Sequence, residues 1–239
     1  MKPTHFETFR REAMGSVSAF ICVLCVVTFF VFTVLSAVGV VSWHDAFRVF
    51  GLSRSAIMEH FRIYQFATAP LVHGNLLHLC FNMLTLWCLG PSVEAMLGRK
   101  RYIFFSLVCA FAAELAFLCF SREPRAVVIG YSAVIYGILV GQALFYPNST
   151  LYVFAFFPLK MKHAVFLLAG VELYFTLLPN PGGVGHVEHI FGAGTALIFV
   201  KCVQWRKALQ GAGPPQRHVR RVTMKPIARV VTRDIPGEL

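Results

Sequence analysis

Residues 127–146 read VVIGYSAVIYGILVGQALFY, and this stretch decides how the whole chain is interpreted. It contains no Asp, Glu, Lys or Arg, and its length matches the roughly 20 apolar residues that a helix needs to cross a bilayer. It nevertheless carries Ser132, Tyr136 and Gln142. Polar groups are costly inside hydrocarbon, so each of them requires a partner or a function.

Five further apolar runs flank this stretch, at 16–42, 71–90, 102–120, 163–179 and 184–203. Of the 239 residues, 57% are hydrophobic and 14% charged, whereas a soluble domain averages about 25% charged residues. We therefore expect an all-α, polytopic membrane protein built as a bundle of six transmembrane helices over residues 16–203. A cytoplasmic N-terminus (1–15) and a basic, disordered cytoplasmic tail (204–239) complete the predicted organisation.

The basic residues predict the orientation. If the N-terminus is cytoplasmic and the runs alternate, 17 of the 22 Lys and Arg residues lie on the cytoplasmic side. The positive-inside rule favours this arrangement, with both termini cytoplasmic. The same rule accounts for the formal net charge of +11, so we expect the bilayer, and no nucleic acid, as the partner of these charges.

The cysteines and acidic residues of the apolar runs indicate no cofactor. All seven cysteines lie in or at the ends of the runs, where Cys behaves as a small hydrophobe. Glu114 and Glu172 are interpreted as uncharged or water-facing structural groups. His186 and His189 have a spacing that suits a metal, but no third ligand is evident in the sequence, so neither a metal nor another cofactor is predicted.

Polar residues of three runs fall at similar depths. Measured along helices that begin at 71, 127 and 184, His78 lies about 10 Å from the outer end, and Ser132 and His189 about 8 Å. Small residues beside Ser132 and after His189 allow runs four and six to pack closely. The hydroxyl would then reach the imidazole, which is the nucleophile–base arrangement of acyl transfer. No Asp is found at this depth, and Glu188 projects about 100° away from His189, so the sequence predicts a dyad.

Each of these residues also has a simpler interpretation. Serine is common on packed membrane helices, and His78 with Asn82 could be an interhelical hydrogen-bonding pair. Only the combination with His189 favours a catalytic function. The sequence has no HExxH motif, which excludes the usual zinc-protease pattern.

Three segments resemble the rhomboid family of intramembrane serine proteases over about residues 60–203. Residues 73–82, HGNLLHLCFN, are similar to the family's HxxxxHxxxN segment, residues 130–132 to its GxS motif, and residues 189–192 to its HxxG segment. The chain departs from the family pattern at Ala133 and Ala196, where glycine is usual, and the 43–70 connector lacks a Trp-Arg pair. The resemblance implies that Ser132 is the nucleophile and His189 the base. It assigns the oxyanion donors and their support to His78, Asn82, Tyr136 and Gly130, and it makes His73 and Gly192 structural positions.

The resemblance also implies the function. We expect an endopeptidase that cleaves transmembrane segments of single-pass membrane proteins near the extracytoplasmic face. The alternatives are an inactive rhomboid-like adaptor that binds membrane helices, and a transporter that uses the histidines as a proton relay. We expect a multi-pass protein of a bacterial inner membrane, with a eukaryotic secretory-pathway membrane as the alternative.

Overall fold

The computed structural model describes residues 14–121, 126–153, 157–177 and 184–210, in which helices correspond to all six apolar runs. These helices are α2 (Val17–Ala37), α6 (Leu76–Leu97), α7 (Arg99–Phe120), α8 (Ser132–Phe145), α9 (Met161–Leu177) and α10 (Val184–Leu209). The predicted helical membrane bundle is confirmed as a fold class.

Within the described residues, α2, α6, α7 and residues 185–209 of α10 are long and apolar enough to cross a membrane. Helix α8 is apolar but has 14 residues, and α9 has 17. Among the described residues, length and composition therefore support four of the six predicted spans, and the number six remains a prediction.

The chain divides into two units, one ending at Val203 and one beginning at Gln204. The elements described below belong to the first unit, except for the residues of α10 from Gln204 onward. The predicted N-terminal segment 1–15 and tail 204–239 lie mostly outside the described residues, so their bounds remain predictions.

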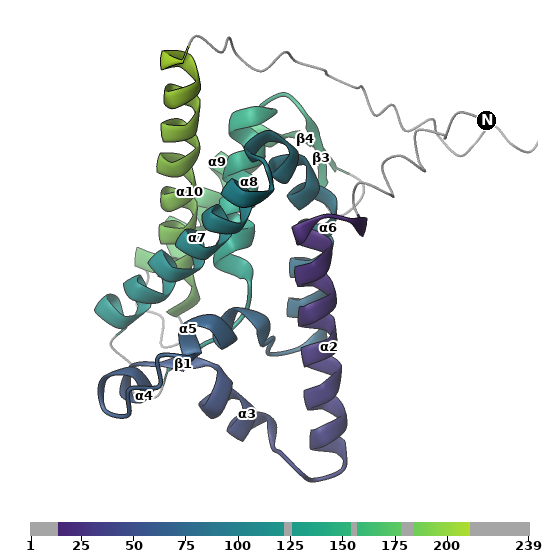
Figure 1. Ribbon diagram of the computed structural model, residues 1–239, viewed down its shortest axis with the longest axis vertical. Helices are drawn as coiled ribbons and strands as arrows, with labels where there is room; N and C mark the ends of the chain where they lie inside the picture. Colours follow the sequence, from purple (N-terminus) through teal and green to yellow (C-terminus); the bar gives the residue numbers. More distant parts are fainter. Residues whose placement is uncertain (1–13, 122–125, 154–156, 178–183, 211–239) are drawn as a thin grey trace, which may run out of the picture. The chain divides into compact units, whose positions relative to one another are not determined.

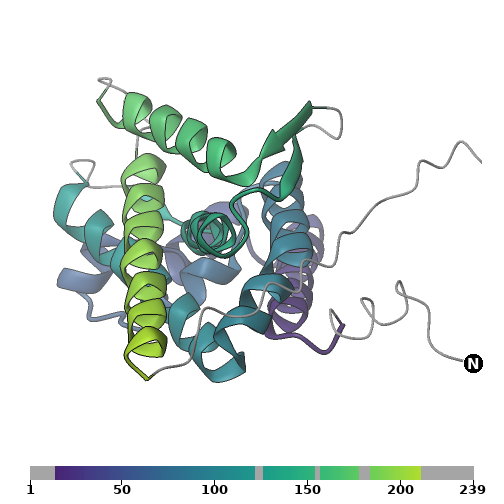
Figure 2. The same ribbon diagram turned by 90° about the horizontal axis from the view of Figure 1, so that it is seen from above.

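Helix α8 lies at the centre of the first unit, in contact with α6, α7 and α9 (Figure 2). Its Val134 and Ile138 are almost completely buried. The outer helices instead expose large apolar side chains, such as Phe30 of α2 and Phe104 of α7. Apolar surface of this extent is costly in water, so it suits contact with lipid.

The 43–70 connector is folded rather than irregular (Figure 1). It contains α3 (Trp43–Phe50), β1 (Leu52–Ser53), α4 (Arg54–Met58), α5 (Gln65–Thr68) and the 3-10 helix η1 (Ala69–Leu71). Gln65 is completely buried, and its side-chain amide donates to the carbonyls of Arg48 and Val49. Trp43 packs on Phe29 of α2 with a ring-centroid distance of 5.4 Å. The amide of one residue thus holds the connector together, and an aromatic contact attaches it to the bundle.

Two of the predicted helix starts are wrong. Helix α8 begins at Ser132 instead of 127, because Val127–Val128 form β2, which pairs antiparallel with β1. Helix α6 begins at Leu76 instead of 71, and the side chain of Asn75 caps it by accepting from the His78 N–H. A run of apolar residues alone does not distinguish a strand from a helix. Ser132 and His78 consequently lie in the first turns of their helices.

A short hairpin connects α8 to α9. Its strands β3 (Thr150–Val153) and β4 (Phe157–Lys160) pair antiparallel, with Thr150 opposite Lys160. The hairpin reverses the chain so that α9 packs against α8.

Candidate active site

Ser132 is the first residue of α8, and the turn before it depends on Gly130. Gly130 has φ = +105°, and its N–H donates to the carbonyl of Ala69 over 2.9 Å. A Cβ at this position would lie 2.6 Å from Cε1 of His78 and would clash with the ring. Glycine is therefore required both for the backbone angle and for the space.

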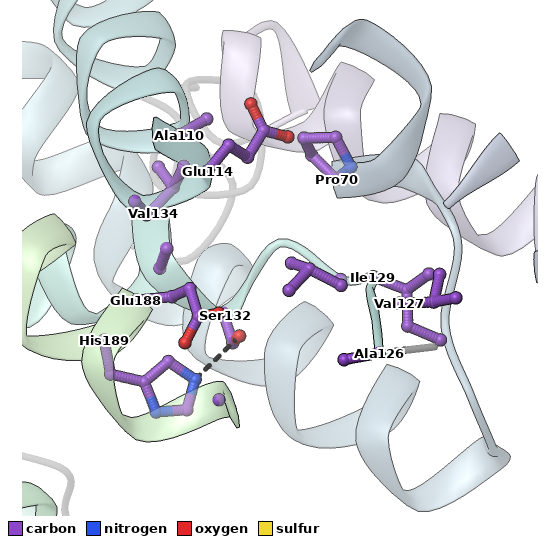
Figure 3. A pocket seen from close by; sticks show the side chains of 15 residues that line it. Pro70, Ala110, Glu114, Ala126, Val127, Ile129, Ser132, Val134, Glu188 and His189 are labelled. Atoms are coloured by element: carbon purple, nitrogen blue, oxygen red, sulfur yellow. Dashed lines mark hydrogen bonds between the residues drawn. The ribbon is translucent and has the colours of Figure 1, made fainter. Parts of the chain in front are cut away.

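His189 of α10 lies opposite this serine. Its Nε2 is 2.9 Å from the Ser132 Oγ, a hydrogen-bond distance (Figure 3). The close approach of the two helices depends on Gly192, since a Cβ there would collide with the carbonyl of Ala133. One turn further along each helix, Ala196 is completely buried and faces Gly137. The structure thus contains the small-residue packing that the sequence predicts between runs four and six.

Tyr136, one turn after Ser132, supports the imidazole. Its ring stacks on His189 with a centroid distance of 4.3 Å and an interplanar angle of 12°. Its hydroxyl donates a hydrogen bond to Oε1 of Glu172. Tyr136 therefore contacts the histidine through its ring and the carboxylate through its oxygen.

Glu172 of α9 is the site residue that the sequence analysis missed. Its Oε1 lies 3.1 Å from Nδ1 of His189, within ion-pair distance although the ring N–H is not well aligned with it. Its Oε2 lies 2.6 Å from Nδ1 of His186, whose ring stacks on Phe175. The interpretation of Glu172 as an uncharged or water-facing structural group did not anticipate its contacts with the two histidines.

A signal for Glu172 was present in the sequence. Counted from the outer end of run 163–179, it lies seven residues in, about 10 Å along a helix, the depth estimated for the other site residues. A glutamate on another helix can orient the imidazole as an aspartate does, with one more methylene in its side chain.

The cluster of Glu172, His186 and His189 is also a potential metal site. Glu172, His186 and His189 each offer a ligand atom, and these atoms lie within 4.8 Å of one another. The sequence argument that no third ligand converges was therefore wrong. However, the 2.6 Å between His186 and Glu172 is a hydrogen-bond distance, whereas two ligands of a tetrahedral zinc ion lie about 3.3 Å apart. The observed spacing suits a shared proton better than a shared metal, and the absence of a metal stays a prediction.

His78 and Asn82 lie four residues apart on one face of α6. The His78 ring borders Gly130. Asn82 is buried, and its Nδ2 has no hydrogen-bond partner among the described residues. His73 is completely buried before α6, with its ring 5.0 Å from that of His78 and its Nδ1 3.4 Å from the Leu71 carbonyl. The site thus has an unused amide donor and two adjacent imidazoles.

A cavity of about 370 Å³ opens beside Ser132 (Figure 3). Ser132 and His189 line it, together with the carboxyl-bearing Glu114 of α7 and Glu188 of α10. The rest of the lining comes from α7, the start of α8 and the segment 126–130 that includes β2, with Pro70 of η1 and Gly185 of α10. A serine and a histidine in hydrogen-bond contact next to a cavity, within helices suited to a bilayer, define an integral membrane protein with a hydrolase-like site.

Comparison with known proteins identifies the family. The family model described as the Rhomboid domain matches residues 60–206. Rhomboid-like protein 15 of Arabidopsis thaliana is 24% identical over 166 residues, which cover 64% of this chain and 41% of the relative. Rhomboid protease GluP of Bacillus subtilis is 27% identical over 165 residues, 68% of this chain and 32% of the relative. Rhomboid protease GlpG of Yersinia pestis is 24% identical over 136 residues, 57% of this chain and 45% of the relative.

The matched domain covers 147 of the 239 residues, from 60 to 206, and the chain therefore belongs to the rhomboid family. The chain spans less than half the length of each of the three relatives. Two of these relatives are named as rhomboid proteases, which is the class that the sequence motifs predict.

Proposed function

We propose that this protein is an intramembrane serine endopeptidase with Ser132 as the nucleophile and His189 as the general base. The observation that carries the proposal is the 2.9 Å contact between the Ser132 Oγ and the His189 Nε2. A hydroxyl in this contact can lose its proton to the imidazole as it attacks a carbonyl. Family membership and the two relatives named as proteases support the same reaction.

In the acylation step, the Ser132 oxygen forms a bond to the scissile carbonyl carbon while its proton moves to Nε2 of His189. The imidazolium then gives this proton to the leaving amine, the peptide C–N bond breaks, and an acyl-enzyme remains. Glu172 is a positioning residue: its carboxylate near Nδ1 keeps the proton of the neutral ring on that nitrogen and stabilises the imidazolium. Tyr136 holds both groups in place.

The negative charge that develops on the carbonyl oxygen requires donors. The Nδ2 of Asn82, the ring of His78 and the backbone N–H of Ser132 are proposed for this function. The N–H groups of a helix's first turn have no partner within the helix, and the amide of Asn82 is unused among the described residues. Neutral donors of this kind stabilise an oxyanion without placing a full charge in the membrane.

Deacylation repeats these steps with water. The water oxygen attacks the ester carbonyl while His189 takes one of its protons. The bond between the acyl carbon and the Ser132 Oγ then breaks, the imidazolium returns the proton to Oγ, and the carboxylic acid product is released. The proposed substrates are single-pass membrane proteins, whose helix must unwind locally because its backbone hydrogen bonds shield the peptide groups. We place the cleavage near the extracytoplasmic face, where water reaches the ester without crossing the bilayer.

The proposal is tested by reconstituting the full chain in vesicles with a quenched-fluorescent single-span substrate. Ser132→Ala and His189→Ala are each expected to lower kcat by about 10³-fold or more, because the two residues act as a unit. Ser132→Ala should also abolish covalent labelling by a fluorophosphonate, which reacts with activated serines. The matched control, Ser106→Ala, removes another buried serine of the bundle and should leave kcat within about twofold.

An inactive adaptor gives a different pattern. It would bind the substrate helix in the wild type and in Ser132→Ala alike, with no cleavage and no labelling in either. That result would overturn the proposed function.

A further inference from the structure

The carboxylate of Glu172 is shared by two imidazoles, and the proposed reaction uses only one of them. Its Oε1 lies 3.1 Å from Nδ1 of His189, and its Oε2 lies 2.6 Å from Nδ1 of His186. His186 precedes His189 by three residues in α10, and residues at this spacing are neighbours on a helix surface. A second histidine thus contacts the group that orients the general base.

The two imidazoles are held in the same manner. His189 stacks on Tyr136 with an interplanar angle of 12°, and His186 stacks on Phe175 with a centroid distance of 5.1 Å and an angle of 16°. Phe175 follows Glu172 by three residues in α9, so one face of α9 supplies both groups that contact His186. Each ring is therefore fixed in its plane by an aromatic neighbour and in its direction by one carboxylate oxygen.

The two oxygens of Glu172 have different partners. Oε1 accepts from the hydroxyl of Tyr136 and faces His189, whereas Oε2 has His186 as its partner in the part of the chain that the structure describes. Glu172 is 5% exposed, and a buried carboxylate that loses a partner is destabilised. Without His186, the carboxylate would turn away from His189 or take up a proton, and either change would weaken its effect on the base.

We propose that His186 is a second positioning residue of the peptidase: its Nδ1–H holds Oε2 of Glu172, so that Oε1 stays at Nδ1 of His189. This inference rests on the proposed function, in which His189 is the general base. The ring centroids of the two histidines are 6.3 Å apart, so the effect of His186 on His189 passes through the carboxylate. A neutral imidazole suits this position, because it donates one proton without adding a charge inside the membrane.

The test is a double-mutant cycle on kcat, measured with the full chain and the quenched-fluorescent single-span substrate in vesicles. His186→Leu removes the donor and should lower kcat by about tenfold with KM nearly unchanged, a loss typical of groups coupled by direct contact. In the Glu172→Gln background, where the charge is already absent, the same substitution should lower kcat by less than about twofold. The two losses differ because His186 acts through the carboxylate.

Conservative variants separate the hydrogen bond from the packing of the ring. His186→Asn keeps an N–H donor near the position of Nδ1, and kcat should return to within about threefold of the wild type. Phe175→Leu keeps the imidazole and removes its stacking partner, so kcat should fall by about threefold where Glu172 is present. It carries the same cycle if His186→Leu does not fold. The matched control is His163→Leu, an exposed histidine in the first turn of α9, which should leave kcat within about twofold.

Rates are compared below the lowest melting temperature of the set, so that unfolding does not contribute to kcat. Three results would overturn the inference: a kcat of His186→Leu equal to that of the wild type, the same fold loss in both Glu172 backgrounds, or equal losses for the Leu and Asn variants. The last two would mean that His186 acts independently of Glu172 or only fills space. A failure of the proposed function is distinct, because the wild type then cleaves no substrate and the fluorophosphonate does not label Ser132; the inference would fall with it.

Discussion

At the scale of single residues, Glu172 is the feature that separates this site from a simple Ser-His pair. Its carboxylate contacts His189, His186 and Tyr136, which belong to two other helices. A buried carboxylate is stable only when such partners surround it. A side chain that connects three others in this way is suited to fixing the orientation of the imidazole.

We predict that Glu172→Gln lowers kcat by about 10- to 100-fold and leaves KM nearly unchanged, since the amide can donate to Nδ1 and favour the wrong tautomer. Glu172→Asp should recover part of the loss, because it keeps the charge. The measurement is the kcat–KM split in vesicles, together with the melting temperature of each variant. A lower melting temperature with unchanged kcat would assign Glu172 a purely structural role.

The cluster of Glu172 with the two histidines yields a second prediction at this scale. Because a shared proton fits the spacing better than a metal, treatment with EDTA should leave the cleavage rate unchanged. Rates measured before and after removal of divalent ions check this. A rate that falls with EDTA and recovers on addition of zinc would show that the cluster binds a metal required for activity.

At the scale of helices, the contact between α8 and α10 determines whether the serine and histidine meet. Gly192→Val places side-chain atoms where the Ala133 carbonyl lies, so the helices must separate and the hydrogen bond between Oγ and Nε2 must break. We predict that kcat falls by about tenfold or more and that the melting temperature decreases. Gly194→Ala is the control on the same helix, since nothing lies within 4 Å of its Cβ position. Equal activity of Gly192→Val and the wild type would contradict this packing argument.

The arrangement of the helices was in part predictable from the sequence. The long apolar runs were sufficient to predict the helical bundle. The small residues Gly192 and Ala133 were sufficient to predict the contact of runs four and six, because helices can approach closely where both carry small side chains. The strand at 127–128 was not predictable from its own composition. It exists because Leu52 and Ser53, about 75 residues earlier, pair with it, and such a long-range pairing leaves no local pattern.

The partners of the buried glutamates were likewise not predictable from the sequence. Glu114, Glu172 and Glu188 lie at similar depths in three apolar runs, so depth alone does not show which of them contacts His189. In the structure Glu172 has three partners, whereas the other two have none among the described residues. The distinction depends on how α7, α9 and α10 are rotated about their axes. A helix that is apolar on all sides does not show in its sequence which face is turned toward the bundle.

At the scale of the molecule, the orientation in the membrane determines which side supplies water to the site. With 17 of 22 basic residues on one side, we predict that the loop at Glu59 is extracytoplasmic and the turn at Lys100 is cytoplasmic. In a variant whose exposed cysteines, Cys80, Cys88, Cys119 and Cys202, are replaced by alanine, Glu59→Cys should react with a membrane-impermeant maleimide in intact cells. Lys100→Cys should react only after permeabilisation. The reverse pattern would put Ser132 near the cytoplasmic face, and cleavage would then occur at the opposite end of the substrate's transmembrane segment.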